Sequence, residues 1–132
     1  MMMAFGYNNA ANAYKSNSVN YASKDQLLLM LVDGAVKFSK TAHNDILEKR
    51  VKEAHVNLTK TQDIFYELMA TLDVDAAGEW GKNLFNIYQF ITRRLGDANM
   101  KKDSKIMEEI IPLIEEVRDT WHEAYKISKG TK

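Results

Sequence analysis

Apolar residues recur every three or four positions along most of this sequence, and that spacing limits the fold more than any other feature. It is the spacing that places side chains on one face of an α-helix, whereas the alternation typical of strands is absent. Four stretches carry it, and helices are expected over residues 24–46, 49–72, 78–100 and 104–127. The sequence therefore predicts an all-α chain.

The four expected helices have similar lengths of about 30 to 35 Å. The connections between them are short, so sequential helices are expected to be antiparallel. The 132 residues suit one domain, and we predict an antiparallel up-down bundle of four long helices over residues 23–128. Ser23 and Gln26 form a capping-box pattern at its start. Residues 1–22, rich in Asn, Ala, Ser and Tyr, are expected to form a flexible N-terminal arm, and residues 129–132 a disordered tail.

The charge balance argues against nucleic acid as a partner. Lysine and arginine number 18, aspartate and glutamate also number 18, and the net charge is zero, whereas nucleic-acid-binding proteins carry a positive excess. The absence of cysteine excludes disulfides and thiol catalysis, and it is typical of a reducing compartment such as the cytoplasm. No apolar run approaches the roughly 18 residues that span a bilayer, so no membrane insertion is expected.

A catalytic or metal site is not expected either. A carboxylate-bridged metal pair in a helical bundle needs two Glu-x-x-His pairs that face inward. Among His43, His55 and His122, only His122 has an acidic residue three positions earlier, and that residue is Asp119. No serine is paired with a histidine in an evident pattern. We therefore predict no catalytic residue, no metal and no cofactor.

The stretch LLLMLVDG, residues 27–34, is more apolar than one buried face requires. On a helical wheel, residues such as Leu31 make a core stripe of ordinary width. Leu29, Val32 and Val36 widen the apolar arc to about 200°. Two interpretations stay open: the helix packs against two neighbours within its own bundle, or the surplus is a hydrophobic groove for another chain.

The helix expected at 78–100 has a similar flank beside its inward stripe of Leu84, Ile87, Ile91, Leu95 and Ala98. On the second interpretation, the groove is lined by apolar, aromatic and rim residues of both helices: Leu28, Leu29, Val32, Asp33, Val36, Phe85, Tyr88, Thr92, Arg94 and Asn99. Side chains of the N-terminal arm are expected to cover it when it is empty: Tyr7, Tyr14, Val19 and Tyr21.

Several local motifs follow one another in a familiar order. They are Tyr14 with Asn17, Ser18 and Val19, then ASKDQLLLMLVDGAVKF (22–38), NLTKTQDIFYEL (57–68), NLFNIYQFITRRLGDANMKKD (83–103) and VRDTWHEA (117–124). In this order, across residues 14–125, they resemble the FliS family of flagellin export chaperones. The sequence departs from the family at Trp80 and Gly81, where a milder aliphatic pair is usual.

The resemblance implies a cytoplasmic export chaperone that binds the disordered C-terminal segment of flagellin. Such a chaperone prevents premature polymerisation and delivers its cargo to the flagellar type III export apparatus. The implied partners are flagellin and a component of the flagellar export gate, with other flagellar regulators as further candidates. From the residues alone a second function stays open, a homo-oligomeric structural bundle whose surplus apolar face meets its own copy.

Overall fold

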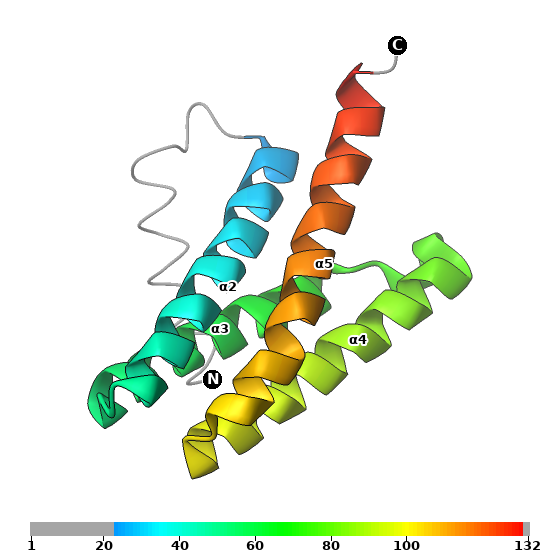
Figure 1. Ribbon diagram of the computed structural model, residues 1–132. Coiled ribbons are helices and arrows are strands. Elements are labelled where there is room, and N and C mark those ends of the chain that lie inside the picture. Colours follow the sequence, from blue (N-terminus) through cyan, green and yellow to red (C-terminus); the bar gives the residue numbers. More distant parts are fainter. Residues whose placement is uncertain (1–22, 131–132) are drawn as a thin grey trace.

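The computed structural model describes residues 23–130, and that range is almost entirely helical (Figure 1). Within it the chain forms four α-helices and no strand: α2 (Lys24–Leu47), α3 (Val51–Thr71), α4 (Val74–Lys101) and α5 (Ser104–Gly130). The predicted all-α bundle of four helices is confirmed.

Six of the eight helix ends lie within two residues of the predicted ones. α4 begins at Val74, four residues before its predicted start, but its backbone is non-helical at Gly78, the residue at which the helix was predicted to begin. α5 runs to Gly130, so the tail predicted at 129–132 begins inside this helix. The predicted N-terminal arm, residues 1–22, lies outside the described residues.

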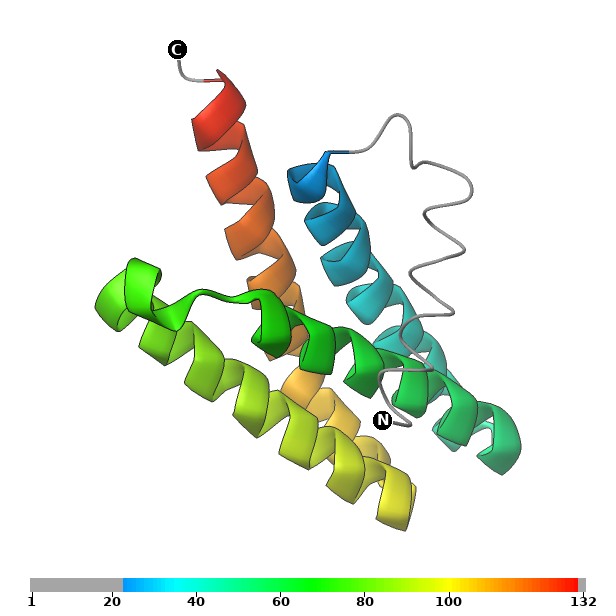
Figure 2. The same cartoon turned by 180° about the vertical axis from the view of Figure 1, so that it is seen from behind.

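The helices form a ring in which each contacts two neighbours. α2 packs against α3 and α5, and α4 packs against the same two helices. Figure 1 shows α2 and α5 as an antiparallel pair in front, with α3 and α4 crossing behind them, and Figure 2 shows that second pair from the back. Consecutive helices run in opposite directions, as an up-down bundle requires.

Side-chain hydrogen bonds fix the ends of the helices. Ser23 Oγ accepts from the Gln26 N–H at 3.2 Å and Gln26 Oε1 accepts from the Ser23 N–H at 3.0 Å, so the predicted capping box starts α2. At the α2–α3 turn, the buried Asp45 carboxylate accepts from Arg50 Nε at 3.1 Å and from Asn57 Nδ2 at 2.8 Å. This carboxylate ties the end of α2 to the start of α3.

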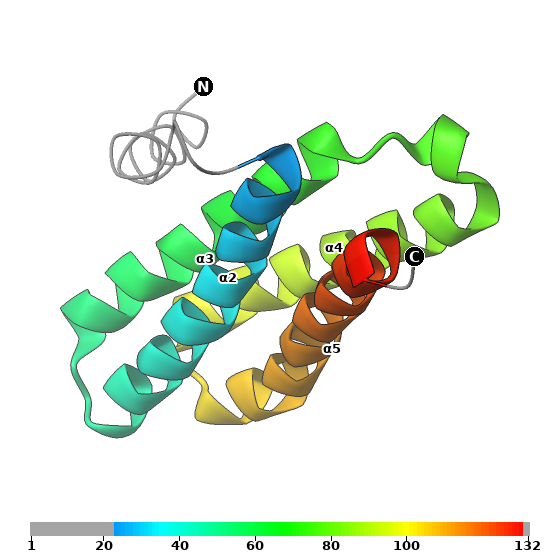
Figure 3. The same ribbon diagram turned by 90° about the horizontal axis from the view of Figure 1, so that it is seen from above.

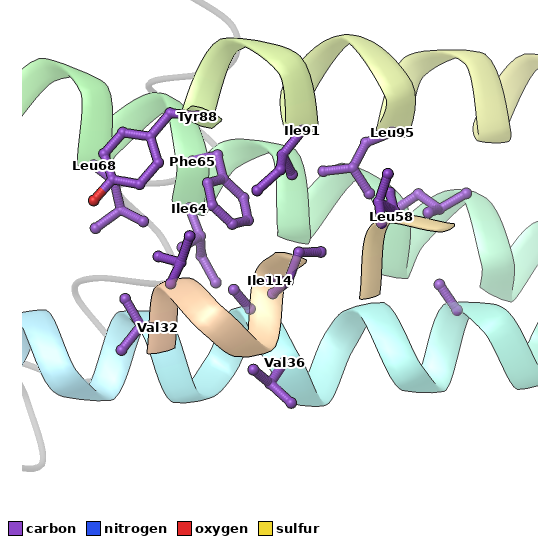
Figure 4. Packing of buried hydrophobic residues seen from close by; sticks show 14 of the residues in the cluster. Val32, Val36, Leu58, Ile64, Phe65, Leu68, Tyr88, Ile91, Leu95 and Ile114 are labelled. Carbon is purple, nitrogen blue, oxygen red and sulfur yellow. The ribbon is translucent and has the colours of Figure 1, made fainter. Parts of the chain in front are cut away.

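All four helices contribute to one core (Figure 4). Phe65 of α3 and Tyr88 of α4 meet edge to face at its centre, with ring centroids 5.8 Å apart. Around them pack buried aliphatic side chains, which include Val32, Val36, Leu58, Ile64, Leu68, Ile91, Leu95, Ile110 and Ile114. This shared core, more than helix propensity, stabilises the bundle.

Val32 and Val36, assigned above to a surplus face of α2, are buried in this core. The reason is the place of α2 in the ring: it contacts both α3 and α5, and two adjacent seams together use a wide apolar arc. The first interpretation of the stretch LLLMLVDG therefore explains these two valines. Only its beginning stays partly open, because residues 27–30 are half-buried.

The inward stripe of α4 also differs from the prediction at one position. Ile87 was predicted to point inward and is 40 % exposed, while Tyr88, predicted on the flank, is fully buried. Both choices fit a spacing of three and four residues from Leu84. The burial of Tyr88 leaves no polar group unsatisfied, because its hydroxyl accepts from the indole N–H of Trp121 at 2.8 Å.

Candidate functional site

One end of the bundle holds an apolar cavity of about 340 Å³. Figure 3 looks down on this end of the bundle, with the start of α2, the α3–α4 connection and the C-terminal half of α5. Its lining draws on all four helices: Leu28, Leu68, Thr71, Leu72, Asp73, Ala76, Ala77, Trp80, Tyr88 and Trp121. We call this the tryptophan cavity.

Two indole rings shape the cavity. Trp80 of α4 and Trp121 of α5 meet edge to face, with centroids 5.5 Å apart and planes at 78°. Trp121 Nε1 donates to the hydroxyl oxygen of buried Tyr88 at 2.8 Å, so the core fixes the orientation of that ring. Trp80 is 48 % exposed. The pair thus presents a large apolar surface to solvent at a position held from within.

The Tyr88 hydroxyl stays protonated under all ordinary conditions. Burial raises its pKa to about 12, and the hydrogen bond from Trp121 opposes this shift only in part. A neutral hydroxyl at this depth has a structural use, because it satisfies the indole N–H and thereby holds Trp121 in place.

The wall beside Trp80 depends on two glycines in α4. The turn that follows Asp73 ends at Gly78, where φ is +67° and ψ is −140°, a conformation open almost only to glycine. The chain then turns into the main part of α4. A Cβ atom on Gly81 would lie 2.6 Å from the Cβ of Ala77, so Gly81 lets the first turn fold closely onto the helix. The cavity keeps its shape through this close approach.

A second hollow of about 210 Å³ adjoins the tryptophan cavity between α2 and α5. Its lining is Asp25, Leu28, Leu29, Trp121, Ala124, Tyr125 and Ser128. We call it the α2–α5 hollow. The two hollows share Leu28 and Trp121, so an apolar surface continues from Trp80 across these side chains to Tyr125.

Only part of the predicted groove coincides with this site. Leu28 and Leu29 line it. Asp33 lies close by, where its Oδ1 contacts His122 Nε2 of α5 at 2.7 Å. Phe85 is half-buried and lines neither hollow.

Three predicted groove residues, Val32, Val36 and Thr92, are corrected to core positions that line neither hollow, because the neighbouring helices enclose them. Tyr88 is also buried, but it lines the tryptophan cavity as a predicted site residue. The Thr92 hydroxyl donates to the backbone oxygen of Tyr88 at 2.8 Å, so it is satisfied within α4.

Arg94 and Asn99 lie far from the cavity and make other contacts. They follow Trp80 along α4 by about 21 and 28 Å at the helical rise. Arg94 donates to Asp97 and Glu109, each at 2.9 Å, and hydrogen bonds to these two carboxylates raise its pKa. Asn99 Nδ2 lies 3.0 Å from His55 Nδ1. Both residues connect helices at the opposite end of the bundle. The predicted covering side chains, Tyr7, Tyr14, Val19 and Tyr21, lie outside the described residues.

Sequence reasoning missed the most prominent residues of the site, Trp80, Trp121 and Leu72. The sequence did contain a signal for the site. The chain has only two tryptophans, and one of them, Trp80, stands between Gly78 and Gly81 in a segment that breaks the helical pattern. Within the described residues no group of three or more His, Asp or Glu side chains gathers as metal ligands would. None of the helices described is long and apolar enough to span a membrane.

Comparisons with known proteins agree with this architecture. Residues 7–128 match the family model described as "Flagellar protein FliS". The flagellar secretion chaperone FliS of Bacillus subtilis is 34 % identical, over 88 % of this chain and 86 % of the relative. The flagellar secretion chaperone FliS of Escherichia coli is 30 % identical, over 82 % and 80 %. A solved structure titled "Crystal structure of flagellar chaperone from bacteria" superimposes with a TM-score of 0.70 at 16 % identity, over 89 % of this chain and 96 % of that one, which shows a shared fold.

Proposed function

The chain belongs to the FliS family of flagellar proteins, and on that premise we propose that it is a cytoplasmic flagellar export chaperone for the disordered C-terminal segment of flagellin. Bound cargo is kept from polymerising too early and passes to the flagellar type III export apparatus, where a component of the export gate receives it. Its relatives are named as chaperones, not enzymes. The observation that carries the proposal is the tryptophan cavity, an apolar hollow beside an exposed indole.

The energetics of cargo binding favour a site that extends beyond one hollow. Ordering a disordered segment costs about 2 to 5 kcal/mol. At about 25 cal/mol per Å² of buried apolar surface, about 80 to 200 Å² only offsets that cost. Lost translational and rotational freedom adds several kcal/mol more. A helical cargo segment would therefore fill the tryptophan cavity with one side chain and continue over Leu28 and Trp121 into the α2–α5 hollow.

Calorimetric titration with a synthetic peptide of the flagellin C-terminal segment tests the proposal. The variant Trp80→Ala removes a large side chain that is 48 % exposed, so its effect on folding should be small. We expect its affinity to fall at least about tenfold, because central aromatic residues dominate such interfaces. Ile87→Ala is the matched control: it lies on the same helix, is 40 % exposed and does not line the cavity. Equal affinities of the two variants would refute the site.

The alternative of a homo-oligomeric bundle is tested with the protein alone. Light scattering at several concentrations should give the mass of a monomer, and the mass should rise only when the flagellin peptide is added. A dimer that persists on dilution and dissociates in the variant Trp80→Ala would instead assign the cavity to self-association.

A further inference from the structure

The segment that frames the tryptophan cavity carries only negative charge. Residues 61–81 contain no lysine or arginine. Within them, Asp73 lines the cavity, and Asp75 and Glu79 are exposed beside its lining residues Ala76 and Trp80. One carboxylate, that of Asp73, therefore lines the apolar cavity, and two exposed ones, Asp75 and Glu79, lie within six residues of it along the chain. We call these three residues the acidic border.

These carboxylates are not neutralised within the described part of the chain. Asp73 Oδ1 accepts from the Ala76 N–H at 3.1 Å as the N-cap of α4, and none of the ion pairs there includes Asp73, Asp75 or Glu79. Acidic residues near a helix start also offset the positive end of the helix dipole, which amounts to about half a unit charge. Three carboxylates exceed that half charge, so the segment 61–81 keeps a net negative charge.

Resting on the proposed function, we propose that the tryptophan cavity selects a helical segment with a large apolar side chain and a lysine or arginine about one helical turn away. The apolar side chain fills the cavity between Trp80, Leu28 and Leu72. The base then lies over the acidic border formed by Asp73, Asp75 and Glu79. Apolar anchoring supplies most of the affinity, and the charge complementarity selects among anchors and fixes the direction of the segment.

Three synthetic amphipathic peptides of about 20 residues test this preference. They share one leucine face and carry lysine, glutamine or glutamate on the flanking positions. Because both tryptophans of the chain lie in the cavity wall, tryptophan emission reports binding directly. We expect the lysine peptide to bind about tenfold more tightly than the glutamine peptide in about 50 mM salt, and the glutamate peptide to bind most weakly. The preference should shrink in about 500 mM salt, where surface charges are screened.

Charge-neutral variants show whether the border causes the preference. In the triple variant Asp73→Asn, Asp75→Asn, Glu79→Gln, asparagine can still cap α4, and the lysine and glutamine peptides should bind equally. A control variant, Glu48→Gln, Glu53→Gln, Glu116→Gln, removes three exposed carboxylates away from the cavity and should keep the preference. A preference that survives in the triple variant, or that the control loses to the same extent, overturns the inference. Far-UV circular dichroism of each variant confirms that it is folded.

The outcomes separate this inference from the proposed function. A lysine preference that depends on the acidic border supports the inference even if the flagellin peptide does not bind, and in that case the cargo assignment fails. If the flagellin peptide binds the unaltered protein and the triple variant with the same affinity, the inference is overturned and the cargo assignment stays in place.

Discussion

The hydrogen bond between Trp121 and Tyr88 is expected to couple the cavity wall to the core. Tyr88 is fully buried and accepts from Trp121 Nε1 at 2.8 Å. The substitution Tyr88→Phe keeps the ring and its edge-to-face contact with Phe65, and it removes only the oxygen. Trp121→Phe removes the donor. Each single variant breaks the same bond, and the double variant leaves neither partner unsatisfied.

The size of the effect follows from the burial of each partner. A neutral hydrogen bond contributes about 0.5 to 1.5 kcal/mol net to stability. In Tyr88→Phe the half-buried indole N–H can find water, so we expect a loss of about 1 kcal/mol. In Trp121→Phe the fully buried hydroxyl is left without a partner, which costs about 1 to 3 kcal/mol in addition to the lost packing. Because the double variant leaves neither partner unsatisfied, it should lose only the packing, and the coupling energy of the cycle should be at least about 2 kcal/mol, the sum of the two polar losses.

Urea denaturation followed by far-UV circular dichroism measures all four free energies of unfolding without relying on the indole signal. Tyr66→Phe serves as the control, because this half-buried hydroxyl makes no hydrogen bond among the described residues. If Tyr88→Phe lowers the free energy of unfolding equally in the presence of tryptophan or phenylalanine at position 121, the coupling is zero. The ring of Trp121 would then be positioned by packing alone, and the reasoning would be wrong.

Three further changes probe the rest of the bundle. Gly78→Ala should lower the free energy of unfolding by about 1 to 3 kcal/mol in thermal denaturation, since φ is +67° and ψ is −140° there. Burial raises the pKa of Asp63 to about 6, so the ionised carboxylate destabilises the fold above that pH. Asp63→Asn should therefore stabilise the protein by about 1 to 3 kcal/mol at pH 8, and the gain should vanish as the pH falls through 6 to 4. His122→Gln should change the free energy of unfolding by less than about 1 kcal/mol, because the contact with Asp33 is largely exposed.

Each of these changes has an outcome that contradicts its premise. An unchanged melting temperature of Gly78→Ala would mean that the α3–α4 connection adopts another conformation. If Asp63→Asn stabilises the protein equally at pH 8 and pH 4, ionisation of Asp63 is not the cause of the gain in stability. A large decrease in the free energy of unfolding of His122→Gln would show that the packing of α2 against α5 depends on this surface contact.

The helices could be predicted from the sequence because their signals are local. The spacing of Leu58, Phe65 and Leu68 and the Ser23 cap concern residues that are neighbours along the chain. Local spacing could not show which of Ile87 and Tyr88 points into the core, because both lie three or four residues from the other residues of the inward stripe. The burial of Tyr88 depends on tertiary contacts such as that with Trp121, which is 33 residues away in sequence and supplies the partner for the Tyr88 hydroxyl.

The site was harder to predict because it is assembled from all four helices. Leu28, Leu72, Trp80 and Trp121 belong to different helices or their ends, and no periodicity within one helix brings them together. Trp80 and Gly81 stand in the segment that interrupts the helical pattern, where periodicity gives no guidance.

The burial of α2 decides where on the bundle a partner can bind. A groove along the whole of α2 would need Val32 and Val36 at the surface, yet α3 and α5 enclose both. Accessible apolar surface of this helix remains in its first turns, where Leu28 and Leu29 line the two hollows, and at its last residue, Leu47, which lines neither hollow. A partner segment that used the hollows of α2 would thus anchor at the end of the bundle, beside Trp80, and extend from there along α5. For this reason a substitution at Trp80 should affect binding more than any surface change in the second half of α2.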